Sequence, residues 1–193
     1  MNNNLEQRTL LPGLNQFATR AEGEDLYIEG YFSVFNSSYP VFDGVEEQIA
    51  PGAFADTLGG DIRALINHDT SLVLGRTKSG TLTLREDNRG LWGSVRINPE
   101  DQDAVNLYRR VQRGDVDQCS FGFYIEAETR EVLEDGTVRY TINKVRLLEV
   151  SVVTFPAYEE TSVSARGRQE AAIRDRELSE WRIATLKKLK ESE

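Results

Sequence analysis

The chain has 193 residues, a formal net charge of −9, one cysteine and one histidine. An acidic chain of this kind is not expected to bind nucleic acid, because nucleic-acid binders gather cationic side chains on one surface. A single cysteine cannot form an internal disulfide, and no run approaches the ~18 apolar residues of a membrane span, so a disulfide scaffold and a membrane protein are not expected. The first residues lack the basic and apolar regions of a signal peptide, and a reducing cytoplasm is the expected setting.

The distribution of charge and of β-forming residues divides the chain into three segments. Residues 1–24 are expected to form an N-terminal extension, whose asparagines near the start favour a frayed end. Residues 25–165 hold short runs rich in Val, Ile, Tyr, Phe and Thr between turn-forming residues, which predicts one mainly β domain. The predicted strands cover 26–35, 62–67, 80–85, 91–97, 120–127 and 138–154.

Two helices are expected to interrupt these strands. Asn98 is a suitable N-cap, Pro99 suits a first helical turn and Gly114 ends the periodic run, so a helix is predicted between them. A second, shorter helix is expected over 53–58. Many strands with few helices are typical of a barrel or a folded-over sheet.

The last two predicted strands are joined by a strong turn signal. Glu134-Asp135-Gly136-Thr137 separates 120–127 from 138–154. Asp-Gly supplies the two positive-φ residues that a tight hairpin turn needs. These strands are therefore predicted to pair as an antiparallel hairpin.

Residues 166–193 form the third segment. They hold eight basic and six acidic side chains, a net charge of +2 in a chain whose total is −9. Ala, Arg, Glu, Lys and Leu dominate this segment, and they favour helix. The apolar residues fall near one face, so an amphipathic C-terminal helix is predicted.

Any chemistry that needs an imidazole must use His68, the only histidine of the chain. A serine hydroxyl is a poor nucleophile at neutral pH, and a neutral imidazole can take its proton. Ser120 lies in a run of apolar β-formers, and its neighbour Cys119 is a competing nucleophile. Because consecutive strand residues face opposite sides of a sheet, only one of the two can meet His68.

The base needs a third group that fixes its tautomer and stabilises the imidazolium, and a carboxylate does both. Glu149 stands in an otherwise apolar strand, where a charge is costly unless it has a partner, and it is the preferred candidate. Asp69 is the alternative. It directly follows His68, so its carboxylate would need a bend in the chain to reach the ring.

Stabilisation of a developing negative oxygen requires hydrogen-bond donors aimed at it. Ala157 and Tyr158, in the loop after the Glu149 strand, are candidates for this role or for contact with substrate, and so is Gly122. No Cys/His cluster resembles a zinc site. Acyl transfer by a serine needs no metal or cofactor, and none is expected.

Six stretches of the sequence resemble the prohead maturation proteases of tailed bacteriophages, and their order and spacing carry the resemblance. They are GYFSVFN at 30–36, IAPGAF at 49–54, NHD at 67–69, LGR at 74–76, GDVD at 114–117 running into SFGF at 120–123, and LEVSVVTFPA at 148–157. The resemblance covers roughly residues 26–165. It implies a serine endopeptidase with the chain order His68, Ser120, Glu149, because the third member in the family follows the serine.

The resemblance also implies a fold and a biological setting. The family is related in fold to the herpesvirus assembly proteases, which implies an antiparallel β-barrel with flanking helices. The implied partners are the phage major capsid protein and its scaffold segment, with self-association, inside the immature prohead in the host cytoplasm. The segment 166–193 would then target the protease to the scaffold and be removed by self-cleavage.

Two other functions stay open from the residues themselves. The domain could be a catalytically silent capsid or scaffold interaction module, with His68 and Ser120 in structural positions. It could also be a cysteine-dependent peptidase that uses Cys119. A serine-directed phosphonate would label Ser120 in a serine enzyme, whereas iodoacetamide would block a cysteine enzyme.

Overall fold

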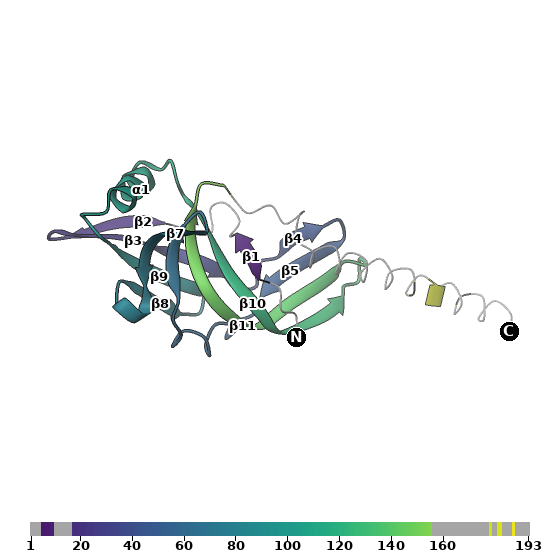
Figure 1. Cartoon of the computed structure of the whole chain (residues 1–193). Helices are drawn as coiled ribbons and strands as arrows, with labels where there is room; N and C mark the ends of the chain where they lie inside the picture. Colours follow the sequence, from purple (N-terminus) through teal and green to yellow (C-terminus); the bar gives the residue numbers. More distant parts are fainter. Residues whose placement is uncertain (1–4, 10–16, 156–177, 179–180, 183–186, 188–193) are drawn as a thin grey trace.

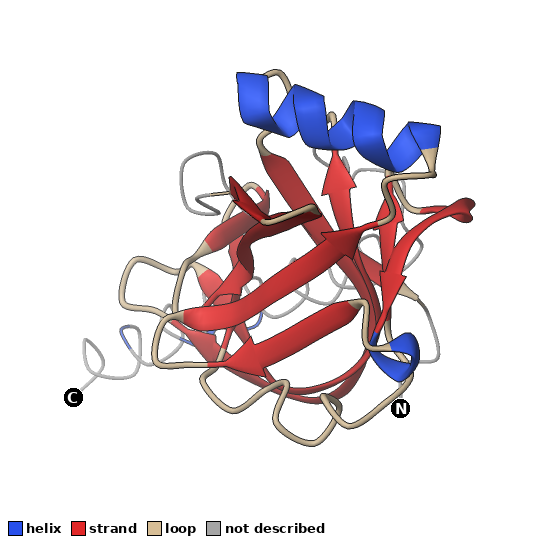
Figure 2. Cartoon of the chain, turned by 90° about the vertical axis from the view of Figure 1, so that its left-hand side faces the viewer, coloured by secondary structure: helices blue, strands red, loops and turns tan. Residues whose placement is uncertain are grey.

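A computed structural model describes residues 5–9 and 17–155, together with Leu178, Trp181, Arg182 and Lys187. The described part is mainly β-structure with one α-helix (Figures 1 and 2). Its strands form two sheets. The seven-stranded sheet contains β1 (Glu6–Thr9), β4 (Tyr39–Phe42), β5 (Val45–Ile49), β6 (Arg63–Ile66), β7 (Asp69–Arg76), β10 (Gln118–Val132) and β11 (Val138–Val153). The four-stranded sheet contains β2 (Ala18–Glu22), β3 (Asp25–Val34), β8 (Leu82–Glu86) and β9 (Gly90–Ile97).

The predicted hairpin is confirmed and is the longest element pair of the fold. β10 and β11 pair antiparallel from Gln118↔Val153 to Val132↔Val138. Gly136 has φ 85°, which a residue without a Cβ adopts at low cost, and it lies in the turn between the strands. β10 extends beyond the predicted range at both ends.

β11 also carries two short strands on its other edge, and both run parallel to it. β5 pairs with Val138–Ile142, and β6 pairs with Glu149–Val152. β5 and β6 therefore both run in the same direction as β11. The residues between β6 and β11 supply the long crossover connection that parallel pairing requires. The expectation that all strands pair antiparallel is therefore wrong. The described strands form a mixed seven-stranded sheet and an antiparallel four-stranded sheet.

The four-stranded sheet packs on the seven-stranded one through an apolar core. Phe32 and Val95 of the four-stranded sheet are buried together with Phe54, Phe121 and Phe123. The ring centroids of Phe54 and Phe121 are 5.6 Å apart in an edge-to-face arrangement, and those of Phe121 and Phe123 are 4.9 Å apart. Burial of each such side chain stabilises the fold by roughly 1.5–3 kcal/mol.

The predicted helix is present as α1 (Gln102–Arg113), but it begins later than expected. Asp101 is the N-cap, and its carboxylate accepts from the backbone N–H groups of Asp103 and Ala104. Asn98 instead accepts from the backbone N–H of Glu100, which closes a separate turn before the helix. Gly114 ends the helix with φ 85°, as predicted.

The second predicted helix, over 53–58, is not formed. The backbone N–H groups of Ala53, Ala55, Thr57 and Gly60 each donate to the carbonyl three residues earlier. These bonds make successive turns, without the i to i−4 ladder of an α-helix. Within residues 17–155, the only helix besides α1 is the short 3₁₀-helix η1 (Thr77–Ser79).

The two terminal segments have different outcomes. Residues 1–24, expected as an extension, contribute β1 and β2, one strand to each sheet. The predicted C-terminal helix over 166–193 lies outside the described residues except at Leu178, Trp181, Arg182 and Lys187, and it stays a prediction. No helix among the described residues is long and apolar enough to cross a membrane.

Candidate active site

His68 lies in the two-residue turn between β6 and β7. Ile66 and Asp69 are the last paired residues, and Asn67 and His68 both have positive φ, 50° and 61°. Positive φ at both central positions is the geometry of a type I′ hairpin turn. The Asn67 side-chain oxygen accepts from the backbone N–H of Thr154 at 2.8 Å, which ties the turn to the end of β11.

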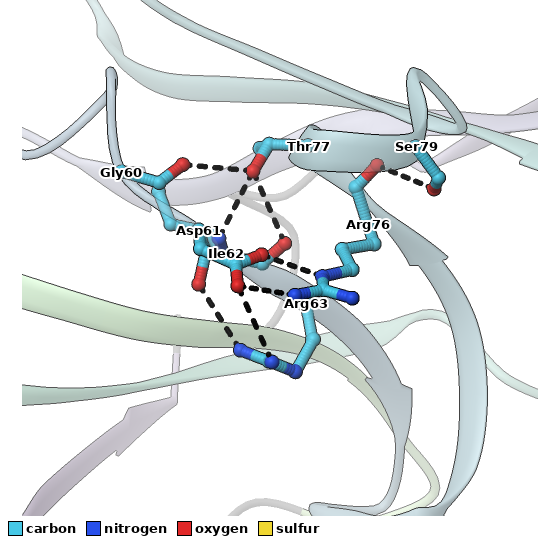
Figure 3. A network of polar contacts seen from close by, with 7 residues as sticks. All are labelled: Gly60, Asp61, Ile62, Arg63, Arg76, Thr77 and Ser79. Atoms are coloured by element: carbon cyan, nitrogen blue, oxygen red, sulfur yellow. Dashed lines mark hydrogen bonds and ion pairs between the residues drawn. The ribbon is translucent and has the colours of Figure 1, made fainter.

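Polar contacts at the other end of the β6–β7 hairpin hold its strands together (Figure 3). Arg76 Nε donates to Asp61 Oδ1 at 2.6 Å, and Arg63 donates to the backbone carbonyl of Asp61 at 3.1 Å. The Thr77 hydroxyl donates to the carbonyl of Gly60 at 2.8 Å. The Arg76 hydrogen bond lowers the pKa of Asp61 to about 2, so this carboxylate is charged at neutral pH. The hairpin that carries the candidate base is thus fixed at both ends.

The ring of His68 is held by Glu149 of β11. His68 Nδ1 and Glu149 Oε1 are 2.7 Å apart, and both side chains are largely buried. The second carboxylate oxygen, Oε2, accepts from the Ser151 hydroxyl at 2.6 Å. Ser151 Oγ in turn accepts from the backbone N–H of His68 at 3.3 Å. Ser151 therefore connects the carboxylate to the turn that presents the ring.

These contacts determine which ring nitrogen can act as a base. A carboxylate accepts hydrogen bonds, so its contact with Nδ1 selects the tautomer that carries the proton there. Nε2 of His68 is then the acceptor, and it is buried without a hydrogen-bond partner among the described residues. Leaving a buried polar atom unpaired costs about 1–3 kcal/mol. The site keeps a proton acceptor available at that cost.

Gly122 makes room for Glu149. The two residues are cross-strand partners in the β10–β11 pair. A Cβ at position 122 would lie 2.4 Å from Glu149 Oε1, closer than real Cβ contacts. Gly122, a sequence candidate for oxyanion or substrate contact, thus lies directly beneath the carboxylate that holds His68.

Ser120 lies on the same face of the sheet as this carboxylate. It is directly opposite Ser151 in the antiparallel register, and side chains of such pairs have Cβ atoms about 4.5–5.5 Å apart. The Ser120 hydroxyl is fully buried and donates to the backbone carbonyl of Arg8 in β1 at 2.9 Å. The structure therefore brings Ser120 beside the His68, Glu149 and Ser151 cluster, with its hydroxyl hydrogen-bonded to β1 and not to the ring.

The two competing sequence candidates have other partners. Cys119 faces the opposite side of β10, and its fully buried thiol donates to the carbonyl of Tyr31 at 3.1 Å. The Asp69 carboxylate accepts from the hydroxyl of Ser71 at 2.6 Å and from its backbone N–H at 2.8 Å. The Ser71 hydroxyl lowers the pKa of Asp69. Both groups are engaged away from the His68 ring.

The remaining sequence candidates, Ala157 and Tyr158, lie outside the described residues. Two residues that sequence reasoning passed over also belong to the site. Ser151 carried a usable signal, because it lies two positions after Glu149 on one strand and so faces the same side. Arg8 carried none, because its contact with Ser120 joins residues 112 positions apart.

Taken together, the groups can support acyl transfer by a serine, in which an oriented imidazole removes the hydroxyl proton. The described residues contain no group of three or more His, Cys, Asp or Glu side chains that could hold a metal ion.

Comparison with known proteins yields three findings. The sequence model of the caudovirus prohead serine protease family matches residues 15–176. The prohead protease of Enterobacteria phage HK97 is 30% identical over 164 residues, which are 83% of this chain and 68% of that protein. The solved structure of the bacteriophage T4 capsid assembly protease has a TM-score of 0.50 and 15% identity, and the match covers 79% of this chain and 98% of that chain. At this identity, the structural likeness concerns the fold.

Proposed function

Because the chain belongs to the caudovirus prohead serine protease family, we propose that Ser120, His68 and Glu149 carry out its peptide-bond hydrolysis. The protein is a serine peptidase of phage capsid maturation. Membership of a serine peptidase family favours Ser120 over Cys119, and an enzyme over a silent interaction module. The observation that carries the assignment is the His68–Glu149 contact, which leaves Nε2 buried, without a hydrogen-bond partner among the described residues, on the face where Ser120 lies.

The reaction begins with rotation of the Ser120 hydroxyl from the Arg8 carbonyl to Nε2 of His68. Nε2 takes the hydroxyl proton while Oγ bonds to the carbonyl carbon of the substrate. The carbonyl oxygen becomes an oxyanion, and His68 becomes an imidazolium whose charge Glu149 stabilises. The imidazolium then gives its proton to the leaving amine, which yields an acyl-enzyme and the first product.

Water completes the cycle by the same route in reverse. His68 takes a proton from water, the hydroxide attacks the acyl carbon, and the Ser120 oxygen recovers its proton from the imidazolium. Ala157 and Tyr158 are our candidates for the donors to the oxyanion, because they follow the strand that carries Glu149. Backbone N–H groups at that position would stabilise charge that forms only during the reaction.

We further propose that the substrates are the phage major capsid protein and its scaffold segment, cut inside the immature prohead in the host cytoplasm. The names of the relatives, a prohead protease and a capsid assembly protease, support this setting. Residues 166–193 would target the protease to the scaffold and be removed by self-cleavage. An active protease released early would destroy its own scaffold, so confinement within the particle fits this role.

The proposal is tested by mass spectrometry of the products formed from the matching capsid protein. The purified enzymes compared are wild type, Ser120→Ala and Cys119→Ala. Cleavage by wild type and Cys119→Ala, with none by Ser120→Ala, is expected. A serine-directed phosphonate should label wild type at Ser120 and should not label Ser120→Ala. Cleavage that survives in folded Ser120→Ala would overturn the assignment of the nucleophile.

A further inference from the structure

β1 pairs with the edge of β10 that β11 does not occupy, and β10 is the strand that carries Ser120. β10 has β11 on one side, and β1 pairs antiparallel with it on the other, in the register Thr9↔Ser120, Arg8↔Phe121 and Glu6↔Phe123. Extended peptides bind proteins by adding a strand to such an edge, where backbone hydrogen bonds give affinity and alternate side chains enter pockets. An extended substrate that reaches Ser120 from this side must pair where β1 pairs.

The backbone of β1 meets the nucleophile as a substrate would. The Ser120 hydroxyl is 2.9 Å from the carbonyl oxygen of Arg8. This hydrogen bond joins the hydroxyl to the carbonyl oxygen and not to the carbonyl carbon, so it places the Arg8–Thr9 peptide group beside the nucleophile without a near-attack geometry. Arg8 then takes the place of the substrate residue on the N-terminal side of the scissile bond.

The Arg8 side chain lies on the face of the sheet opposite to the Ser120 side chain, where it contacts the buried carboxylate of Glu47. Its guanidinium donates through two nitrogens to the two carboxylate oxygens of Glu47 on β5, with Nη2 to Oε2 at 3.0 Å. Arg8 is 7% exposed and Glu47 is 2% exposed. The guanidinium also lies 5.6 Å from the centre of the Phe123 ring. A bidentate contact with a buried carboxylate is the arrangement that best recognises arginine.

Two observations indicate that β1 is an occupant of this site and can be exchanged. The family match begins at residue 15, after β1, whereas Glu47 and Ser120 lie within it. Within β1, Glu6 is 2% exposed; its Oε2 accepts from Nη1 of Arg8 at 3.0 Å, and its Oε1 has no hydrogen-bond partner among the described residues. A buried carboxylate oxygen without a partner opposes the docking of this segment, which makes its displacement easier.

We infer that residues 6–9 act as an internal substrate mimic, and that Glu47 selects arginine or lysine immediately before the bond that Ser120 cleaves. Glu47 is a specificity-determining residue, and β1 competes with the substrate for the edge of β10. The inference rests on the proposed function, because it takes Ser120 as the nucleophile.

The test uses the full chain and a set of peptides that copy residues 5–12, with Arg, Lys, Gln or Glu at the position of Arg8. Wild type should cleave the Arg and Lys peptides after that residue, with kcat/KM roughly 100-fold or more above the Gln and Glu peptides. Glu47→Gln should reduce this preference by at least ~tenfold. Glu46→Gln is the matched control, because the neighbouring side chain faces away and pairs with Arg139. It should keep the wild-type preference.

A second set of variants is needed if Glu47→Gln alone does not fold, since this change removes the bidentate carboxylate from the buried Arg8 guanidinium. Arg8→Gln should lower KM for the Arg peptide by weakening the competing strand. Arg8→Gln combined with Glu6→Gln and Glu47→Gln removes the buried cation together with both carboxylates that pair with it, and should fold yet lose the preference for a basic residue.

The outcomes separate this inference from the proposed function. Ser120-dependent cleavage of the capsid protein with equal rates on the Arg and Gln peptides, or cuts in the capsid protein that follow no basic residue, would overturn the role of Glu47 alone. An unchanged KM in Arg8→Gln would overturn the role of β1. Loss of all Ser120-dependent cleavage by folded wild type would overturn both.

Discussion

Replacement of Gly122 by alanine tests whether the position of the Glu149 carboxylate controls the reaction. The new Cβ would lie 2.4 Å from Oε1, 3.1 Å from Cδ and 3.2 Å from Cγ of Glu149, whereas ordinary van der Waals contact begins at 3.4 Å. The carboxylate must therefore move by about 1 Å. That same Oε1 contacts Nδ1 of His68 at 2.7 Å, so the movement breaks or lengthens the contact that orients the ring.

A misplacement of about 1 Å in a catalytic group lowers the rate on the order of 100-fold. We expect kcat of Gly122→Ala to fall by about that factor, equivalent to ~2.7 kcal/mol of transition-state stabilisation, with little change in KM. Gly59→Ala is the matched control, because no heavy atom lies within 4 Å of a Cβ built there. It should keep wild-type kinetics.

The assay has two readouts, peptide cleavage and the state of the ring. Because His68 is the only histidine of the chain, ¹⁵N NMR of the imidazole reports on it without assignment. Wild type at neutral pH should show the proton on Nδ1, and Gly122→Ala should show a mixture of tautomers. Wild-type kcat together with an unchanged tautomer in folded Gly122→Ala would refute the reasoning about Glu149.

Three further predictions concern the supports of the site and of the fold. Ser151→Ala removes the hydrogen bond to Oε2 of Glu149, so kcat should fall about tenfold, the equivalent of ~1.4 kcal/mol. An unchanged kcat with a wild-type pH–rate profile would contradict this expectation. Asp61 has its pKa lowered to about 2 by the hydrogen bond from Arg76, so the stability that it contributes is present above its ordinary pKa of 3.8 and is lost as the pH falls towards 2. The free energies of urea unfolding of wild type and Asp61→Asn should differ at pH 6 and converge near pH 2. A difference that does not change with pH would argue against the contribution of the Asp61–Arg76 ion pair. Asp101→Ala should lower the free energy of unfolding by ~1 kcal/mol, because it removes the N-cap of α1, and an unchanged urea midpoint would show that the cap contributes little.

Local signals in the sequence predicted those elements whose cause is local. The Asp135-Gly136 turn joins β10 to β11 as expected, because a turn depends on the backbone freedom of its own residues, here on the positive φ of Gly136. Gly114 ends α1 for the same kind of reason. The prediction of Asn98 as the cap was wrong, because Asp101 caps α1 and the Asn98 side chain closes the preceding turn.

The sequence also led to the preferred partner of His68. Glu149 was singled out as a charge in an apolar strand, and its carboxylate lies 2.7 Å from Nδ1. The alternation of strand side chains separated Cys119 from Ser120, and the two do face opposite sides of β10. These inferences depend only on the periodicity of one strand and on the cost of a buried charge.

By itself, then, the sequence determined the β-rich class, the hairpin that carries Ser120 and Glu149, and, through the order of its resembling stretches, the family. Only the tertiary structure decided that β5 and β6 run parallel to β11 on one edge and that β1 lies over Ser120 on the other. The reason is that a strand's own pattern states which face is apolar and leaves open which free edge it joins. That choice depends on side chains far away in sequence, as in the contact of Arg8 with Glu47, 39 residues apart. Such a contact forms only when the strands of the seven-stranded sheet come together.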